Sequence, residues 1–125
     1  MADPTAEFFA ELGRRGHEPL LSQARGTLRF DLKDGKRTDR WHVSIKEGDV
    51  AVSRKNVAAD CVVRTDKALF DGMVSGESHA LTTFLRGLMA VEGDGELVVL
   101  FQRLFPSPPG TGEGRHLAGY ARRAR

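Results

Sequence analysis

The sequence predicts a single α+β domain, and three observations carry this prediction. Segments between residues 26 and 55 alternate apolar and polar side chains, the two-residue period of half-buried strands, and only short turns separate them. Residues 4–16 and 65–87 instead repeat their apolar side chains every three or four positions, as amphipathic helices do. The 125 residues, 40% of them hydrophobic, are enough for one core and too few for two.

The first predicted element is a short helix. In "PTAEFFAELG", Phe8, Phe9 and Leu12 lie at helical spacing, with Thr5 as the N-cap. Gly13 or Gly16 would end the helix.

Three strands are predicted next, in "GTLRFDL", "RWHVSIK" and "VAVSRK". The turns "KDGKRTD" and "EGD" are too short for anything but antiparallel neighbours, which predicts a meander. In the first strand the apolar side consists of Leu28, Phe30 and Leu32, and in the second of Trp41, Val43 and Ile45.

A fourth strand, "DCVVRT", leads into two further helices. The first is capped by Thr65 or Asp66 and ends at Gly76, and the second is capped by Ser78 and ends at Gly87. The apolar side of the second helix would be formed by Leu81, Phe84 and Leu85. "LMAVEG" is predicted as the last strand, which brings the number of strands to five.

The apolar run "ELVVLFQRLF", residues 96–105, is predicted as a final helix, with a strand as the rival because Val98 and Val99 are β-branched. It is about half as long as a membrane span of roughly 20 residues. Residues 1–105 are therefore expected to form the domain, and the Pro- and Gly-rich residues 106–125 a flexible tail. Four arginines against one glutamate give this tail a net charge of 4 − 1 = +3, which would suit transient contact with an anionic membrane.

Location and cofactors follow from what the sequence contains. The single cysteine, Cys61, has no disulfide partner, and the amino terminus has no secretory pattern, so a cytoplasmic protein is expected. The body lacks a basic stripe interleaved with aromatic residues, which argues against nucleic-acid binding. The four histidines are not at metal-ligand spacing, so we expect neither a metal nor a cofactor.

Several segments, in their order and spacing, resemble one known family. They are "GTLRFDLKDG", "WHVSIKEGDVAV", "AADCVVRTD", "LFDGMVSGESHALTTFLRG" and "LMAVEGDGELVVLFQRLF". Together they resemble the sterol carrier protein 2 domain, a non-specific lipid-transfer fold. The resemblance implies a five-stranded, mostly antiparallel sheet covered on one side by helices, with an apolar tunnel between the layers for fatty acyl chains, acyl-CoA or sterols.

The expected function is non-catalytic binding and transfer of an apolar ligand. The predicted cavity wall consists of Phe30, Trp41, Val43, Phe70, Met73, Phe84, Met89, Leu97, Leu100, Phe101 and Leu104. One alternative is an enzyme that acts on a small apolar substrate in the same cavity, with Asp60 as acid or base. Ser78 in "GESHA" lacks the preceding strand of a nucleophile elbow, so a helix cap is expected there. The other alternative is an interaction module without ligand, for which a homodimer would be expected.

Overall fold

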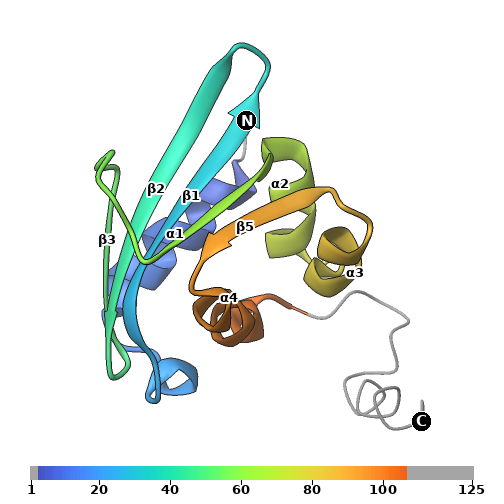
Figure 1. Ribbon diagram of the computed structural model, residues 1–125. Coiled ribbons are helices and arrows are strands. Elements are labelled where there is room, and N and C mark those ends of the chain that lie inside the picture. The colour runs from blue at the N-terminus through green and yellow to red at the C-terminus, as the bar shows by residue number, and fades with distance from the viewer. Residues whose placement is uncertain (1–2, 107–125) are drawn as a thin grey trace, which may run out of the picture.

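The computed structural model describes residues 3–106, which form one five-stranded sheet and a set of helices packed against it (Figure 1). The strands are β1 (Arg25–Asp34), β2 (Arg37–Lys46), β3 (Asp49–Ser53), β4 (Cys61–Asp66) and β5 (Met89–Gly93). The α-helices are α1 (Pro4–Arg15), α2 (Lys67–Ser75), α3 (Ala80–Leu85) and α4 (Gly95–Phe101), and two 3₁₀ turns are η1 (Pro19–Leu21) and η2 (Gln102–Leu104).

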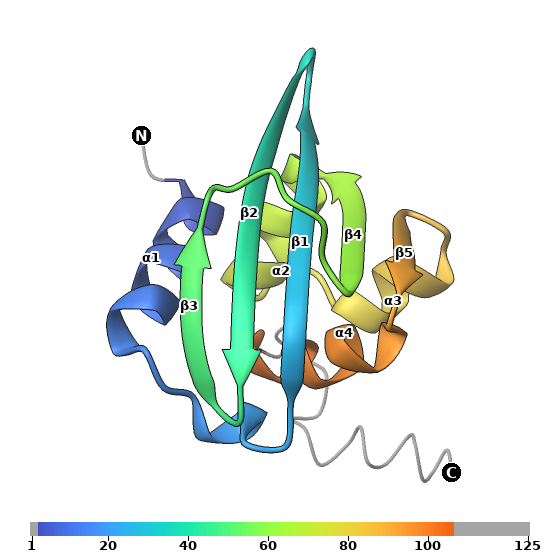
Figure 2. The ribbon, with the colours of Figure 1, turned by 60° about the vertical axis from the view of Figure 1, so that its left-hand side comes forward.

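The sheet has the order β3-β2-β1-β4-β5. Neighbouring strands are antiparallel except for β1 and β4, which run parallel. The parallel pair arises because the chain leaves edge strand β3 and crosses the outer face of the sheet to reach β4 (Figure 2). The predicted α+β class, with five mostly antiparallel strands, is therefore confirmed.

Helix α1 covers the inner face of the sheet beside α2 (Figure 1). Its N-cap is Asp3, whose carboxylate accepts a hydrogen bond from Ala6 N at 3.1 Å, so the predicted Thr5 cap is wrong. Thr5 instead donates its hydroxyl to Asp71 of α2 at 2.6 Å. Lys67 Nζ also reaches Asp3 and Asp71, at 2.9 and 3.1 Å, so one polar network joins the two helices.

Helix α3 differs most from its prediction. Its N-cap is His79 and not Ser78, and the His79 side chain makes no capping hydrogen bond. Phe84 and Leu85, expected on a buried side, are 46% and 72% exposed. The reason is the position of the helix at the edge of the sheet. This six-residue helix rests mainly on edge strand β5, and no further element of residues 3–106 covers its other side.

The segment after β5 is helical, as predicted over the strand alternative. Asp94 caps α4 by accepting a hydrogen bond from Glu96 N at 3.1 Å, and the helix continues into η2. Leu97 and Phe101, four positions apart, are buried against the sheet. The β-branched valines do not make this segment a strand, because tertiary packing of an amphipathic helix outweighs intrinsic propensity.

An aromatic cluster packs between the sheet and the helices α1, α2 and α4. Phe9 of α1 is at its centre, with its ring stacked on Trp41 at 4.8 Å and on Phe70 at 5.7 Å between centroids. Phe30 of β1 contacts Phe9 and Phe101 at 5.3 and 5.1 Å. The strands β1 and β2 and the helices α1, α2 and α4 thus each contribute a large ring to one contiguous core.

The outer face of the sheet is polar, yet part of it is buried. Asp31 of β1 is only 9% exposed. Its carboxylate accepts hydrogen bonds from Nε of Arg29 and Nε of Arg40, each at 3.0 Å. Arg29 also donates to the carbonyl oxygen of Val57, in the segment that crosses from β3 to β4. Strand alternation alone predicts that Asp31 is exposed. Sequence periodicity does not show that the chain between β3 and β4 crosses this face of the sheet.

These ion pairs predict a pH dependence of stability. Burial alone would raise the pKa of Asp31, but the hydrogen bonds and charges of Arg29 and Arg40 outweigh burial, and the pKa lies below its ordinary value. The ionised carboxylate therefore favours folding above the unfolded-state pKa of about 4, and this contribution is lost as pH falls through the folded-state pKa.

We expect Asp31→Asn to lower the free energy of unfolding by about 1–2 kcal/mol at pH 7 and by less near pH 2. Urea titrations of both proteins between pH 7 and 2 measure this difference. A deficit that stays constant over the whole range would show that ionisation of Asp31 does not contribute.

No helix within residues 3–106 has the length and hydropathy needed to span a membrane. The predicted tail begins at Pro106, and residues 107–125 lie outside the described part of the chain. The division into a domain and a tail, and the membrane contact expected of that tail, stay predictions.

Candidate ligand-binding site

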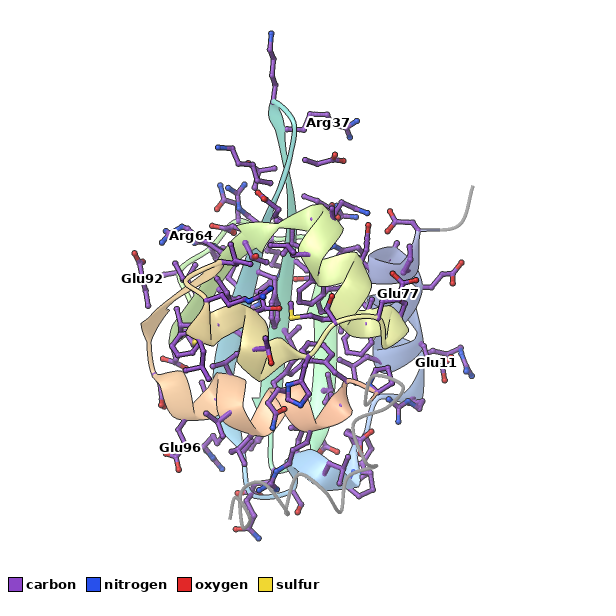
Figure 3. The ribbon with its side chains drawn as sticks, turned by 90° about the vertical axis from the view of Figure 1, so that its right-hand side faces the viewer. Glu11, Arg37, Arg64, Glu77, Glu92 and Glu96 are labelled. Carbon is purple, nitrogen blue, oxygen red and sulfur yellow. The ribbon has the colours of Figure 1, made fainter. Side chains whose placement is uncertain are left out.

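An apolar pocket of about 740 Å³ lies between the sheet and the helices α2, α3 and α4. In Figure 3 these three helices face the viewer, α2 uppermost and α4 lowest. The pocket reaches inward to Phe30 and Val63 on the central strands β1 and β4. Its volume falls within the range of roughly 300–1,000 Å³ that is usual for sites of small molecules.

The pocket wall is formed by side chains from nearly every element around it. Thirteen of the sixteen lining residues are apolar, glycine or proline: Leu20, Phe30, Val63, Phe70, Met73, Phe84, Met89, Val91, Gly95, Val98, Val99, Phe105 and Pro106. The other three are His79, Gln102 and Arg103. Such a wall offers burial to an apolar chain and few polar contacts.

Helix α4 packs against the core with one side and lines the pocket with the adjacent side. Leu97 and Phe101 face the sheet, while Val98 and Val99 line the pocket. Leu97 packs so closely on β1 that a side-chain carbon added at Gly26 would lie 2.9 Å from its Cδ1. The apolar side of this helix is wide because it meets two surfaces.

The structure brings together five of the eleven wall residues predicted from sequence: Phe30, Phe70, Met73, Phe84 and Met89. The other six lie outside this wall. Val43, Leu97 and Phe101 are buried in the core, and Leu100 and Leu104 pack partly buried against it. Trp41 lines a different hollow of about 520 Å³, between α1 and β3, where the guanidinium of Arg54 lies 3.9 Å from the centre of its ring.

Sequence reasoning missed the polar part of the wall. Gln102 and Arg103 lie inside the apolar run of residues 96–105, and polar residues within such a run are a signal for a site that needs them. His79 directly precedes α3, and its Nδ1 atom is buried without a hydrogen-bond partner among residues 3–106. A buried polar atom without a partner is costly, so it marks a place where a ligand atom could bind.

The residues considered for catalysis do not line the pocket. Asp60 is exposed, and its Oδ2 accepts hydrogen bonds from the amide and hydroxyl of Thr27 at 2.9 and 3.2 Å. Ser78 lies against Gly72 of α2, where an added side-chain carbon would be 2.9 Å from its Oγ. Cys61 is fully buried, and this burial, with the charge of Asp94, raises the pKa of its thiol, which disfavours the reactive thiolate.

Comparison with solved structures finds the same fold in carrier proteins. The chain superposes on the sterol carrier protein domain 2 of Helicoverpa armigera with a TM-score of 0.65 and 19% identity, covering 81% of this chain and 84% of that one. For sterol carrier protein 2 of Aedes aegypti, solved in complex with palmitate, the TM-score is 0.61 and the identity 21%, with 82% and 94% covered.

The fold also occurs within an enzyme. An inverting sec-alkylsulfatase from Pseudomonas sp. matches with a TM-score of 0.63 and 22% identity, over 80% of this chain but only 16% of the sulfatase. At these identities the likeness shows the fold alone. A search of curated protein sequences finds no significant match. The model of the SCP-2 sterol transfer family, however, matches residues 9–106, and the chain therefore belongs to that family.

Proposed function

We propose that this protein binds a fatty acyl, acyl-CoA or sterol-like ligand in the pocket between α2, α3, α4 and β5, and transfers it without covalent chemistry. The observation that carries this proposal is the pocket itself, a volume of about 740 Å³ with a predominantly apolar wall. Each methylene group that moves from water into such a site contributes about 0.8 kcal/mol. An acyl chain can therefore bind with few polar contacts.

Two further observations support a carrier. The Aedes aegypti protein of the same fold was solved with palmitate bound. The wall also contains two methionines, Met73 and Met89, whose flexible side chains adapt to ligands of different shape.

Filling the pocket is expected to prevent binding. Val98→Trp places an indole where Val98 now lines the wall, and we expect it to weaken binding of a fluorescent fatty acid at least tenfold, the loss of about two buried methylenes. The matched control is Leu100→Trp on the same helix, because Leu100 packs against the core and does not line the pocket.

Both substitutions enlarge a residue, so circular dichroism must show that both variants fold; over-packing costs about 1–3 kcal/mol. Fluorescence titration then gives the two affinities. Unchanged affinity in Val98→Trp would argue against this pocket, and a loss only in Leu100→Trp would place the ligand elsewhere.

A second candidate is an interaction module, in which apolar side chains of the helical layer contact a partner chain. Leu85 and Leu88 are large and exposed, and each adjoins a wall residue in sequence, Phe84 or Met89. The same fold also forms part of the larger sec-alkylsulfatase chain. Native mass spectrometry before and after delipidation separates the two functions. Co-purified lipid supports the carrier, whereas a ligand-free dimer supports the interaction module.

A further inference from the structure

The wall of the pocket carries positive charge and no negative charge. Among its sixteen lining residues, Arg103 is the only one with a permanent charge, and none is aspartate or glutamate. Glu92 and Glu96, both labelled in Figure 3, lie at the outer edge of this side of the molecule. A ligand in the pocket would therefore meet a positive group with no nearby acidic wall residue to oppose it.

Arg103 also differs from most arginines of this chain. Residues 3–106 contain ten arginines, and seven of them form an ion pair with a carboxylate. Arg103 forms none within this part of the chain, and neither do Arg37 at the β1–β2 turn and Arg86 at the end of α3. Of these three, only Arg103 lines the pocket. Its guanidinium therefore has hydrogen-bond donors available to a ligand.

Two neutral polar side chains share the wall with Arg103. Gln102 precedes it in η2, and His79 leaves its buried Nδ1 without a partner among the described residues. The amide of Gln102 and the imidazole of His79 can each donate a hydrogen bond to an oxygen atom. The remaining wall is apolar, so these three side chains are the polar groups that the wall offers to the head group of a ligand.

We propose, on the basis of the function proposed above, that the pocket selects single-chain amphiphiles that end in a carboxylate, which Arg103 binds with Gln102 and His79 as supporting donors. The planar guanidinium matches the two oxygens of a carboxylate, whereas a neutral hydroxyl forms only an uncharged hydrogen bond. The acyl chain then lies among the aromatic and methionine side chains of the inner wall. Among ligands with acyl chains of equal length, Arg103 thus gives the site its preference for a carboxylate head group.

Ligands with the same chain and different head groups test this proposal. In this experiment, dodecanoate, dodecanol and dodecylammonium each compete with a fluorescent fatty-acid probe for binding to the full-length protein at pH 8. We expect the protein to bind dodecanoate at least about tenfold more tightly than dodecanol, and dodecylammonium most weakly. In Arg103→Gln, the ratio of the affinities for dodecanoate and dodecanol is expected to fall to about one. Arg103→Lys keeps the positive charge but not the planar guanidinium, and we expect it to give an intermediate ratio.

The matched control is Arg86→Gln, which removes an exposed arginine that lies outside the pocket wall and should keep the wild-type ratio. Thermal unfolding checks that each variant is folded. Equal binding of acid and alcohol by the wild type, or an unchanged ratio in Arg103→Gln, overturns the head-group proposal and leaves the carrier function standing. Failure of the wild type to bind the fatty-acid probe and all three ligands would instead overturn the fatty acyl ligand of the proposed function itself.

Discussion

Replacing Phe9 with alanine is expected to lower the free energy of unfolding by about 3–5 kcal/mol, the usual cost of removing a buried aromatic ring. Phe9 is 0% exposed, and its ring contacts four others, those of Phe8, Phe30, Trp41 and Phe70. Urea denaturation measures the change, and Trp41, the single tryptophan and a direct neighbour of Phe9, reports it by fluorescence.

Phe84→Ala is the matched control for this prediction. Phe84 is also a phenylalanine, but it is 46% exposed and belongs to the short helix α3. We expect a stability loss below about 1 kcal/mol together with weaker ligand binding, because Phe84 lines the pocket. Similar stability losses for the two variants would mean that the aromatic cluster around Phe9 is not the main source of stability.

Gly93→Ala is expected to cost about 3 kcal/mol or more and to weaken ligand binding as well. Gly93 ends β5 with φ +91°, a conformation that a residue with a side chain adopts at a cost of about 1–2 kcal/mol. An added side-chain carbon would also lie 2.2 Å from the carbonyl oxygen of Asp60, so the backbone must move. That oxygen accepts the amide hydrogen of Asp94, the N-cap of α4, at 2.8 Å. A shift here therefore displaces the helix that supplies Val98 and Val99 to the pocket.

Gly35→Ala separates these two costs. Gly35 has φ +65°, but an added side-chain carbon there would meet nothing within 4 Å. Its substitution should therefore show the conformational cost alone and leave ligand binding unchanged. Denaturation and probe titration of both variants give the comparison. Equal effects at the two positions would show that the close approach of Gly93 to Asp60 is not what restricts this site.

Local patterns in the sequence were sufficient to predict the elements of the fold. The alternation of Leu28, Phe30 and Leu32 identifies both a strand and its inner side, and all three are fully or almost fully buried. Gly76 ends α2 in a left-handed conformation, as its place after an apolar helical segment predicts. The parallel pairing of β1 with β4 is different in kind, because it depends on the path of the intervening chain across the sheet.

The candidate site was less accessible to sequence reasoning for a similar reason. Helical spacing shows that Leu97 and Val98 belong to one broad apolar side, but not that the first packs on β1 and the second faces a pocket. The exposure of Phe84 depends on α3 lying at the edge of the sheet. A wall assembled from eight helices, turns and strands is a property of tertiary structure, which is why apolar patterning identified only five of its members, Phe30, Phe70, Met73, Phe84 and Met89, and none of its polar residues.

The position of the pocket beside the aromatic core has a consequence for how this protein can diverge. The core rings of Phe9 and Trp41 lie outside the pocket wall, and wall residues such as Phe84 and Val99 are substantially exposed. Substitutions at such exposed positions change the shape of the ligand site at little cost in stability, because they leave the buried rings in place. The pocket can therefore change its shape while the architecture persists, and the same fold is seen in proteins that share only about one-fifth of their residues with this chain.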